Sequence, residues 1–154
     1  MPTARYYLDT SVLNHAFVED APEHRDASLA LLDSIRGEIA EGYISDLVVR
    51  EISHAPDQRR RELQRLLVET PVEVLEVTEE ALRLANRYIA ETIIPRRFRD
   101  DAIHIAVAVV NNLDCIVSWN FRHIVRPGTR RRINAVNRLL GYPEIEIASP
   151  EEVV

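Results

Sequence analysis

The sequence contains no lysine, since all nineteen of its Lys and Arg residues are arginine. This absence excludes mechanisms that depend on a lysine, including phosphate binding by a P-loop, Schiff-base catalysis and lysine-assisted aspartyl-phosphate chemistry. Cysteine is almost as scarce. A single residue, Cys115, excludes an internal disulfide and is typical of a protein from a reducing compartment. We therefore expect a cytoplasmic protein.

Long apolar runs and glycine are also scarce. No run reaches the ~18–20 consecutive apolar residues of a membrane-spanning helix, so we expect no membrane partner. Four glycines in 154 residues predict short loops, and this length favours one domain over residues 1–154. A formal net charge of −6 excludes a generically basic nucleic-acid binder.

Predicted strands and helices alternate along the chain. The predicted strands cover residues 4–9, 43–45, 72–77, 115–118 and 144–149. The predicted helices cover residues 24–42, 46–55, 57–69, 79–95, 100–112 and 129–141. This order predicts an α/β fold, namely a three-layer α/β/α sandwich around a mainly parallel sheet of about five strands.

Two of these helices have informative apolar patterns. In residues 24–42, Leu31, Ile35 and Ile39 recur on one face, and Gly42 is a plausible end for the helix. Residues 100–112 are apolar on nearly every side, which predicts a helix buried in the core.

Three carboxylates stand next to apolar sequence. Asp9 ends the strand-like run "YYLD", Glu51 lies in "ISDLVVREI", and Asp101 opens "DDAIHIAVA". A carboxylate beside so much apolar surface is costly unless it is paired, caps a helix or binds a metal. If the three converge beyond the carboxyl ends of the strands, a hard cation such as Mg²⁺ or Mn²⁺ would relieve their repulsion.

Each acid also has an interpretation without a metal. Asp9 could cap the segment that follows it, Glu51 could lie on a solvated helix face, and Asp101 or its neighbour Asp100 could cap a helix. His104 follows Asp101 by three residues and so lies on a similar side of the helix. It could bind a metal, support a ligand or contact phosphate, or it could be a core histidine bonded to a backbone group or carboxylate.

Four stretches together resemble a PIN domain, the nuclease fold of the toxin in VapBC toxin–antitoxin pairs. They are "YYLDTSVL", "ISDLVVREI", "DDAIHIAVA" and "CIVSWNFRHIV", in the order and at the spacing usual for the family, over nearly the whole chain. The ending "YPEIEIASPEEVV" also resembles a subgroup with "SWNF" and "HIV" in the fourth motif.

The resemblance implies roles for individual residues. Asp9, Glu51 and Asp101 match the family's metal-binding acids, and Thr10 or Ser11 matches the hydroxyl position beside the first acid. Many PIN nucleases have a further Asp after the fourth strand, where this chain has Asn120. An asparagine offers a carbonyl oxygen but no charge, so we expect Asn120 to assist at a weaker second metal site or at none.

By resemblance, the chain is expected to be a Mg²⁺- or Mn²⁺-dependent ribonuclease and the toxin of a type II pair. Its implied partners are an RNA substrate, a cognate antitoxin and further copies of itself in a homodimer or small oligomer. The alternative is a catalytically weak or inactive PIN domain that acts as an RNA- or protein-binding module.

Arginine clusters are candidate phosphate contacts. The cluster just before Asp101, formed by Arg96, Arg97 and Arg99, is expected to bind RNA together with Arg122. Residues 59–61 are also three arginines, but they lie among Glu and Gln on a polar helix. We expect those three to form a solvated face or to meet an acidic partner.

Overall fold

Five parallel strands form the centre of the computed structural model, which describes residues 2–154. Their order in the sheet is β3-β2-β1-β4-β5, and every neighbouring pair is parallel. The strands are β1 (Ala4–Leu8), β2 (Ala40–Ser45), β3 (Val72–Leu75), β4 (Cys115–Val117) and β5 (Glu146–Ala148). The predicted α/β fold with a five-stranded parallel sheet is therefore confirmed.

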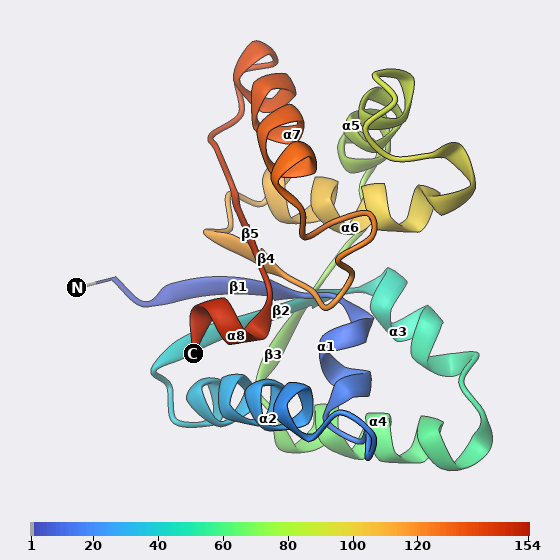
Figure 1. Ribbon diagram of the computed structural model, residues 1–154, viewed down its shortest axis with the longest axis vertical. Coiled ribbons are helices and arrows are strands. Elements are labelled where there is room, and N and C mark those ends of the chain that lie inside the picture. The colour runs from blue at the N-terminus through green and yellow to red at the C-terminus, as the bar shows by residue number, and fades with distance from the viewer. Residues whose placement is uncertain (1) are drawn as a thin grey trace.

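Helices cover both faces of this sheet (Figure 1). They are α1 (Thr10–His15), α2 (Pro22–Arg36), α3 (Asp46–Ser53), α4 (Asp57–Glu69), α5 (Glu79–Ala90), the 3₁₀ helix η1 (Arg96–Phe98), α6 (Arg99–Val110), α7 (Pro127–Leu139) and α8 (Pro150–Val153). In Figure 1, α5, α6 and α7 lie on one side of the sheet, and α1, α2, α4 and α8 lie on the other. None of the helices within residues 2–154 has the length and apolar character needed to cross a membrane.

The order of the strands brings the ends of β1 and β4 together at the middle of the sheet. The chain proceeds from β1 through β2 to β3 at one edge, and it later returns to place β4 and β5 on the other side of β1. The backbone N–H of Asp9, just after β1, donates to the carbonyl of Val117 at the end of β4 over 3.2 Å. Open α/β sheets gather functional groups at such a point, beyond the carboxyl ends of the strands.

Helix α6 is buried on every side over most of its length. All eight side chains from Ala102 to Val109 are buried, and the helix packs against α5 and β4. An apolar surface all round a helix is stable only when neighbouring elements cover it completely. The predicted buried helix at residues 100–112 is therefore confirmed, and its rigid packing fixes the direction of Asp101 at its first turn.

The predicted helix over residues 24–42 is wrong at its carboxyl end. Helix α2 ends at Arg36, and the positive φ of 60° at Glu38 turns the chain into β2. Ile39, which the periodicity placed on the buried face, is 75% exposed. Gly42 ends no helix. It lies in β2 opposite Tyr6 of β1.

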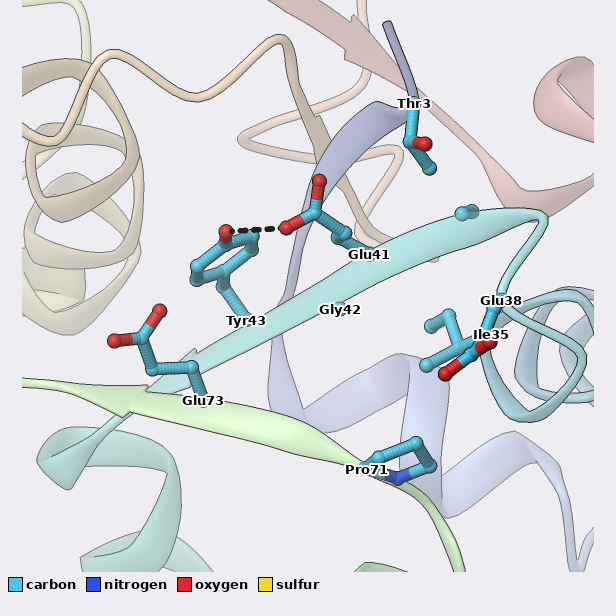
Figure 2. A pocket seen from close by; sticks show the side chains of 9 residues that line it. Thr3, Ile35, Glu38, Glu41, Gly42, Tyr43, Pro71 and Glu73 are labelled. Atoms are coloured by element: carbon cyan, nitrogen blue, oxygen red, sulfur yellow. Dashed lines mark hydrogen bonds between the residues drawn. The ribbon is translucent and has the colours of Figure 1, made fainter.

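Gly42 allows α2 to pack closely on the sheet. A Cβ atom at this position would lie 2.8 Å from Cδ1 of Ile35 and 3.0 Å from Cγ1 of Val72. Figure 2 shows the Ile35 side chain reaching from α2 towards β2 near this glycine. The glycine therefore reflects a close approach between two elements rather than the end of a helix.

A shallow cavity of about 350 Å³ lies at the amino-terminal ends of β2 and β3 (Figure 2). Its lining includes the carboxylates of Glu38, Glu41 and Glu73, and the Tyr43 hydroxyl donates to Glu41 over 3.1 Å. Because parallel strands all end at the opposite edge, this cavity is remote from Asp9. It has no part in the site described next.

Candidate active site

The three predicted acids converge at the carboxyl edge of the sheet. Asp9 directly follows β1, Glu51 lies in α3 after β2, and Asp101 lies in the first turn of α6. Hydrogen bonds join the elements that carry them. The hydroxyl of Thr10, beside Asp9, donates to Glu51 over 2.7 Å, and the amide of Asn120, after β4, donates to Asp101 over 3.2 Å.

Asp9 is both the cap of a helix and the most buried of the three acids. It is 5% exposed and is the N-cap of α1, where its Oδ1 accepts from the backbone N–H of Ser11 over 3.1 Å. Oδ1 also accepts from the Ser11 hydroxyl over 2.5 Å, and Oδ2 accepts from the Ser118 hydroxyl over 2.6 Å. Burial raises the pKa of Asp9 although these bonds favour its charged form. The capping interpretation and the site interpretation are therefore compatible.

Glu51 is held by a buried histidine. The Nε2 atom of His104 lies 2.8 Å from Oε1 of Glu51, which also accepts from Thr10. Burial opposes ionisation of Glu51, but the bond to His104, the charge of that ring and the Thr10 hydroxyl outweigh it and lower the pKa of Glu51. A carboxylate held in its charged form at a sheet edge is a suitable ligand for a cation.

His104 is itself fixed by groups on two strands. Its Nδ1 lies 2.7 Å from the hydroxyl of Tyr7 in β1, and that hydroxyl lies 2.8 Å from Oγ of Ser45 in β2. Burial disfavours the charged ring, but the bond to Glu51 and the surrounding carboxylates outweigh it and raise the pKa of His104. The structure places His104 in the core, bonded to a carboxylate, which fits both the core histidine and the residue that supports a ligand.

Asp101 is the acid whose charge is least stabilised. Burial raises its pKa to about 6, and the nearby carboxylates of Asp9 and Glu51 contribute to the rise. The charge of His104 and the hydrogen bond from Asn120 act in the opposite direction. Asp101 is therefore the acid at which burial and the neighbouring carboxylates most oppose a negative charge.

The orientation of Asn120 differs from the expectation. Its Oδ1 accepts from the backbone N–H groups of Arg122 and His123 over 3.1 and 3.0 Å. These bonds turn Nδ2 towards Asp101, so Asn120 presents a donor to the acids where a carbonyl oxygen was expected. A donor stabilises the charge of Asp101 and cannot coordinate a cation.

The kind of donor at this site fits a hard divalent cation, because all three acids offer carboxylate oxygens. Within residues 2–154, however, no group of three or more His, Cys, Asp or Glu side chains is arranged so that it could hold a metal ion as it stands. Both oxygens of Asp9 accept serine hydroxyls, and one oxygen of Glu51 accepts two bonds. A cation would therefore require rearrangement of side chains, for which half-exposed Glu51 and Asp101 have more freedom than Asp9.

The predicted arginine contacts fall into two groups. All four side chains are exposed: Arg96, Arg97, Arg99 and Arg122. The ring of His123 packs 4.0 Å from the ring of Phe98, which brings the loop after β4 against η1. Burial lowers the pKa of His123, and the charges of Arg122, Arg126 and Arg97 add to the shift, so these arginines surround one point. Arg99 instead donates to Asn86 of α5 over 3.3 Å.

Several residues of the site carried no clear signal in the sequence. Tyr7, Ser45 and Ser118 contribute hydroxyls at the ends of β1, β2 and β4, where each could be mistaken for an ordinary strand residue. The one available signal is position, since a buried hydroxyl at the carboxyl end of a parallel strand needs a polar partner. These hydroxyls orient the acids and their histidine.

Comparisons with known proteins agree with this fold. The model of the PIN domain family matches residues 6–124, which include Asp9, Glu51, Asp101 and Asn120. The chain has the same fold as one in the crystal structure of VapBC2 from Rickettsia felis bound to a DNA fragment from their promoter, with a TM-score of 0.61. That likeness has 16% sequence identity and covers 94% of this chain and 98% of the other. The comparison with curated proteins found no match.

Proposed function

Because this chain belongs to the PIN domain family, whose members are generally nucleases, we propose that it is a divalent-metal-dependent endoribonuclease. The observation that carries the proposal is the convergence of Asp9, Glu51 and Asp101 at the switch point of the sheet. Burial raises the pKa of Asp101 to about 6, and the nearby charges of Asp9 and Glu51 add to the rise. A bound cation would relieve that repulsion, which is why such a cluster favours metal chemistry over a purely structural role.

Asp9, Glu51 and Asp101 would hold Mg²⁺ or Mn²⁺, the cations best suited to oxygen donors. A divalent cation held there supplies charge for the phosphodiester and lowers the pKa of a water molecule. The chain's own residues provide the orientation. Ser11 holds Asp9, and its hydroxyl also accepts from the backbone N–H of Trp119 over 2.9 Å, which ties the ends of β1 and β4 together.

In this proposal Asn120 is not a metal ligand. As a donor it keeps Asp101 in place and favours its charged form, while its carbonyl oxygen holds the loop that carries Arg122. The proposal therefore needs one cation held by three acids and assigns no second cation to Asn120. The exposed arginines Arg96, Arg97 and Arg122 would contact phosphates of the RNA.

The test is RNA cleavage by the wild-type protein and by Asp9→Asn in Mg²⁺, in Mn²⁺ and in EDTA. Asparagine is as good an N-cap as aspartate, so Asp9→Asn should keep α1 and the fold, as a thermal melt would verify. We expect the wild type to cleave RNA only with a divalent cation and Asp9→Asn to be inactive. Cleavage that persists in EDTA, or in the folded variant, would refute the proposal.

The second candidate is a PIN domain that binds RNA or a protein without cleaving. The observation that favours it is the amide of Asn120, which faces Asp101 in the position where many PIN nucleases have a further acid. In that case RNA would bind equally well in EDTA and would stay intact in Mg²⁺ and Mn²⁺. The cleavage assay therefore separates the two candidates directly.

We further propose that the chain is the toxin of a toxin–antitoxin pair. The VapBC2 complex of Rickettsia felis contains a chain of the same fold, and this likeness is the basis for proposing a cognate antitoxin here. The resemblance to the PIN family also implies a homodimer or small oligomer. A short neighbouring reading frame whose product co-purifies with this chain would support the pairing, and the lack of such a partner would count against it.

A further inference from the structure

A cavity of about 620 Å³ opens beside Glu51 at the carboxyl edge of the sheet. Its lining comes from α1, from α3, from the connection between α3 and α4, and from the start of α4. The lining residues used below are Thr10, Ser11, Asn14, Glu51, His54 and Arg59. Thr10 and Ser11 are the residues that hold Glu51 and Asp9. The cavity is open and shallow, and it adjoins the acidic site through Glu51 and the two residues that hold the acids.

Arg59 lines this cavity, whereas a solvated face was expected for residues 59–61. The side chains of Arg59 and Arg60 are equally exposed, but the guanidinium of Arg59 lies over the ring of Phe17, 5.5 Å from the ring centre. The Nε of Arg59 is buried without a hydrogen-bond partner among residues 2–154. The nearest carboxylate oxygen paired with it, on Glu62, is 3.8 Å away, which is beyond hydrogen-bond distance.

The neighbouring Arg60 is a different case. Its Nη2 donates to Asp57 over 3.0 Å on the same helix, so its charge is already paired. Arg60 does not line the cavity. Both arginines have a carboxylate partner on α4, but only Arg60 makes a hydrogen bond to it and only Arg59 lines the cavity.

We propose that this cavity binds a nucleotide of single-stranded RNA next to the bond that is cut, with Arg59 binding its phosphate. The inference rests on the proposed nuclease function and adds a substrate subsite to it. A strand lying across the acids must continue past them, and Glu51 forms the wall shared by the acids and the cavity. Within that cavity, Arg59 supplies a guanidinium whose planar donors match a phosphate.

Two polar side chains complete the subsite. Asn14 projects from α1 into the same cavity, where its amide can donate and accept hydrogen bonds. His54 bonds the carbonyl of Arg50 through Nδ1 over 2.8 Å, which leaves its Nε2 for a ligand. An amide and an imidazole are suited to base edges and ribose hydroxyls, as RNA recognition requires.

The experiment measures binding of a fluorescein-labelled single-stranded RNA by anisotropy, in the inactive Asp9→Asn background with Mg²⁺. Arg59→Gln is expected to weaken binding about tenfold and to reduce the slope of log K against log salt by about 0.7. The matched control, Arg60→Gln, removes the same charge from the adjacent residue and should change binding less than about twofold. Thermal melts establish that each variant is folded.

If Arg59→Gln does not fold, the binding experiment uses Arg59→Lys in its place. It keeps the charge but loses the paired donors, so it should weaken binding while leaving the salt slope unchanged. Equal effects of Arg59→Gln and Arg60→Gln would overturn the subsite. If the wild type cleaves RNA while the two variants bind alike, the subsite fails and the nuclease function stands. A wild type that neither binds nor cleaves RNA would overturn both.

Discussion

The Nε2 atom of His104 lies 2.8 Å from Oε1 of Glu51, and the opposite nitrogen of the same ring lies 2.7 Å from the hydroxyl of Tyr7. Hydrogen bonds at both ring nitrogens fix the position and the orientation of the imidazole. Glu51, on the short helix α3, therefore takes its place at the site from groups on β1 and α6. The geometry of the acids depends on the core as much as on the acids themselves.

The first prediction concerns Tyr7→Phe. Loss of the hydroxyl leaves Nδ1 of His104 and the hydroxyl of Ser45 without their hydrogen-bond partner. This loss should lower the free energy of unfolding by about 1–3 kcal/mol in a urea titration. Tyr6→Phe on the same strand is the matched control, because the Tyr6 hydroxyl makes no hydrogen bond within the described chain, residues 2–154. Equal stabilities of the two variants would show that the Tyr7–His104 bond contributes nothing.

The second prediction concerns pH and Asp101 in the absence of metal. Its pKa is raised to about 6 from the ordinary 3.8, so the folded protein binds this proton more tightly than the unfolded chain. The resulting contribution to stability is complete below about pH 4 and is lost as the pH rises through 6. The unfolding free energies of the wild type and of Asp101→Asn are measured in EDTA at both pH values. The excess of the wild type over the variant should be about 1–2 kcal/mol smaller above pH 6 than below pH 4. A difference that stays constant with pH would contradict this.

The third prediction concerns Asn120→Asp. An aspartate can still accept from the backbone of Arg122 and His123, but it replaces the donor to Asp101 with a second negative charge. In EDTA the variant should lose about 1–2 kcal/mol of unfolding free energy through this repulsion. In Mn²⁺ it should gain more stability than the wild type does. If Mn²⁺ stabilises both proteins equally, the amide of Asn120 does not limit cation binding.

The fourth prediction concerns the packing of α2 on the sheet. Gly42→Ala places a Cβ against Ile35 and Val72 and should cost about 1–3 kcal/mol of unfolding free energy. Gly128→Ala is the control, because nothing lies within 4 Å of a Cβ there. In α7 it should be neutral or stabilise by less than about 1 kcal/mol. Chemical denaturation compares the two, and equal effects would contradict the close approach.

The sequence predicted the parts of this molecule that follow from local patterns. The run "YYLD" and the apolar residues around Glu51 and Asp101 placed three acids at strand ends and helix starts, and parallel strands bring such ends to one edge. The structure confirms the parallel sheet and brings the three acids together. The periodicity around Ile39 gave a wrong prediction, because the apolar spacing continues past Arg36 although the positive φ at Glu38 turns the chain into β2.

Contacts between residues far apart in the chain could not be predicted from the sequence. Tyr7 and His104 are 97 residues apart, and nothing local marks them as partners. Asn120 was expected to offer oxygen, but two backbone N–H groups of its own loop decide which end of the amide faces Asp101. Arg59 was grouped with its neighbours on a polar helix, because a helical pattern does not reveal which residue faces a cavity formed with α1.

The most direct measurement compares RNA cleavage by Asp101→Asn and Asp100→Asn in Mg²⁺ and Mn²⁺. The two variants remove the same charge from adjacent residues of α6, but Asp100 is exposed and Asp101 faces the other acids. We expect Asp101→Asn to lose cleavage by about 100-fold or more and Asp100→Asn to stay within about twofold of wild type. Equal activity of the two variants would contradict the claim that these three acids form the catalytic centre.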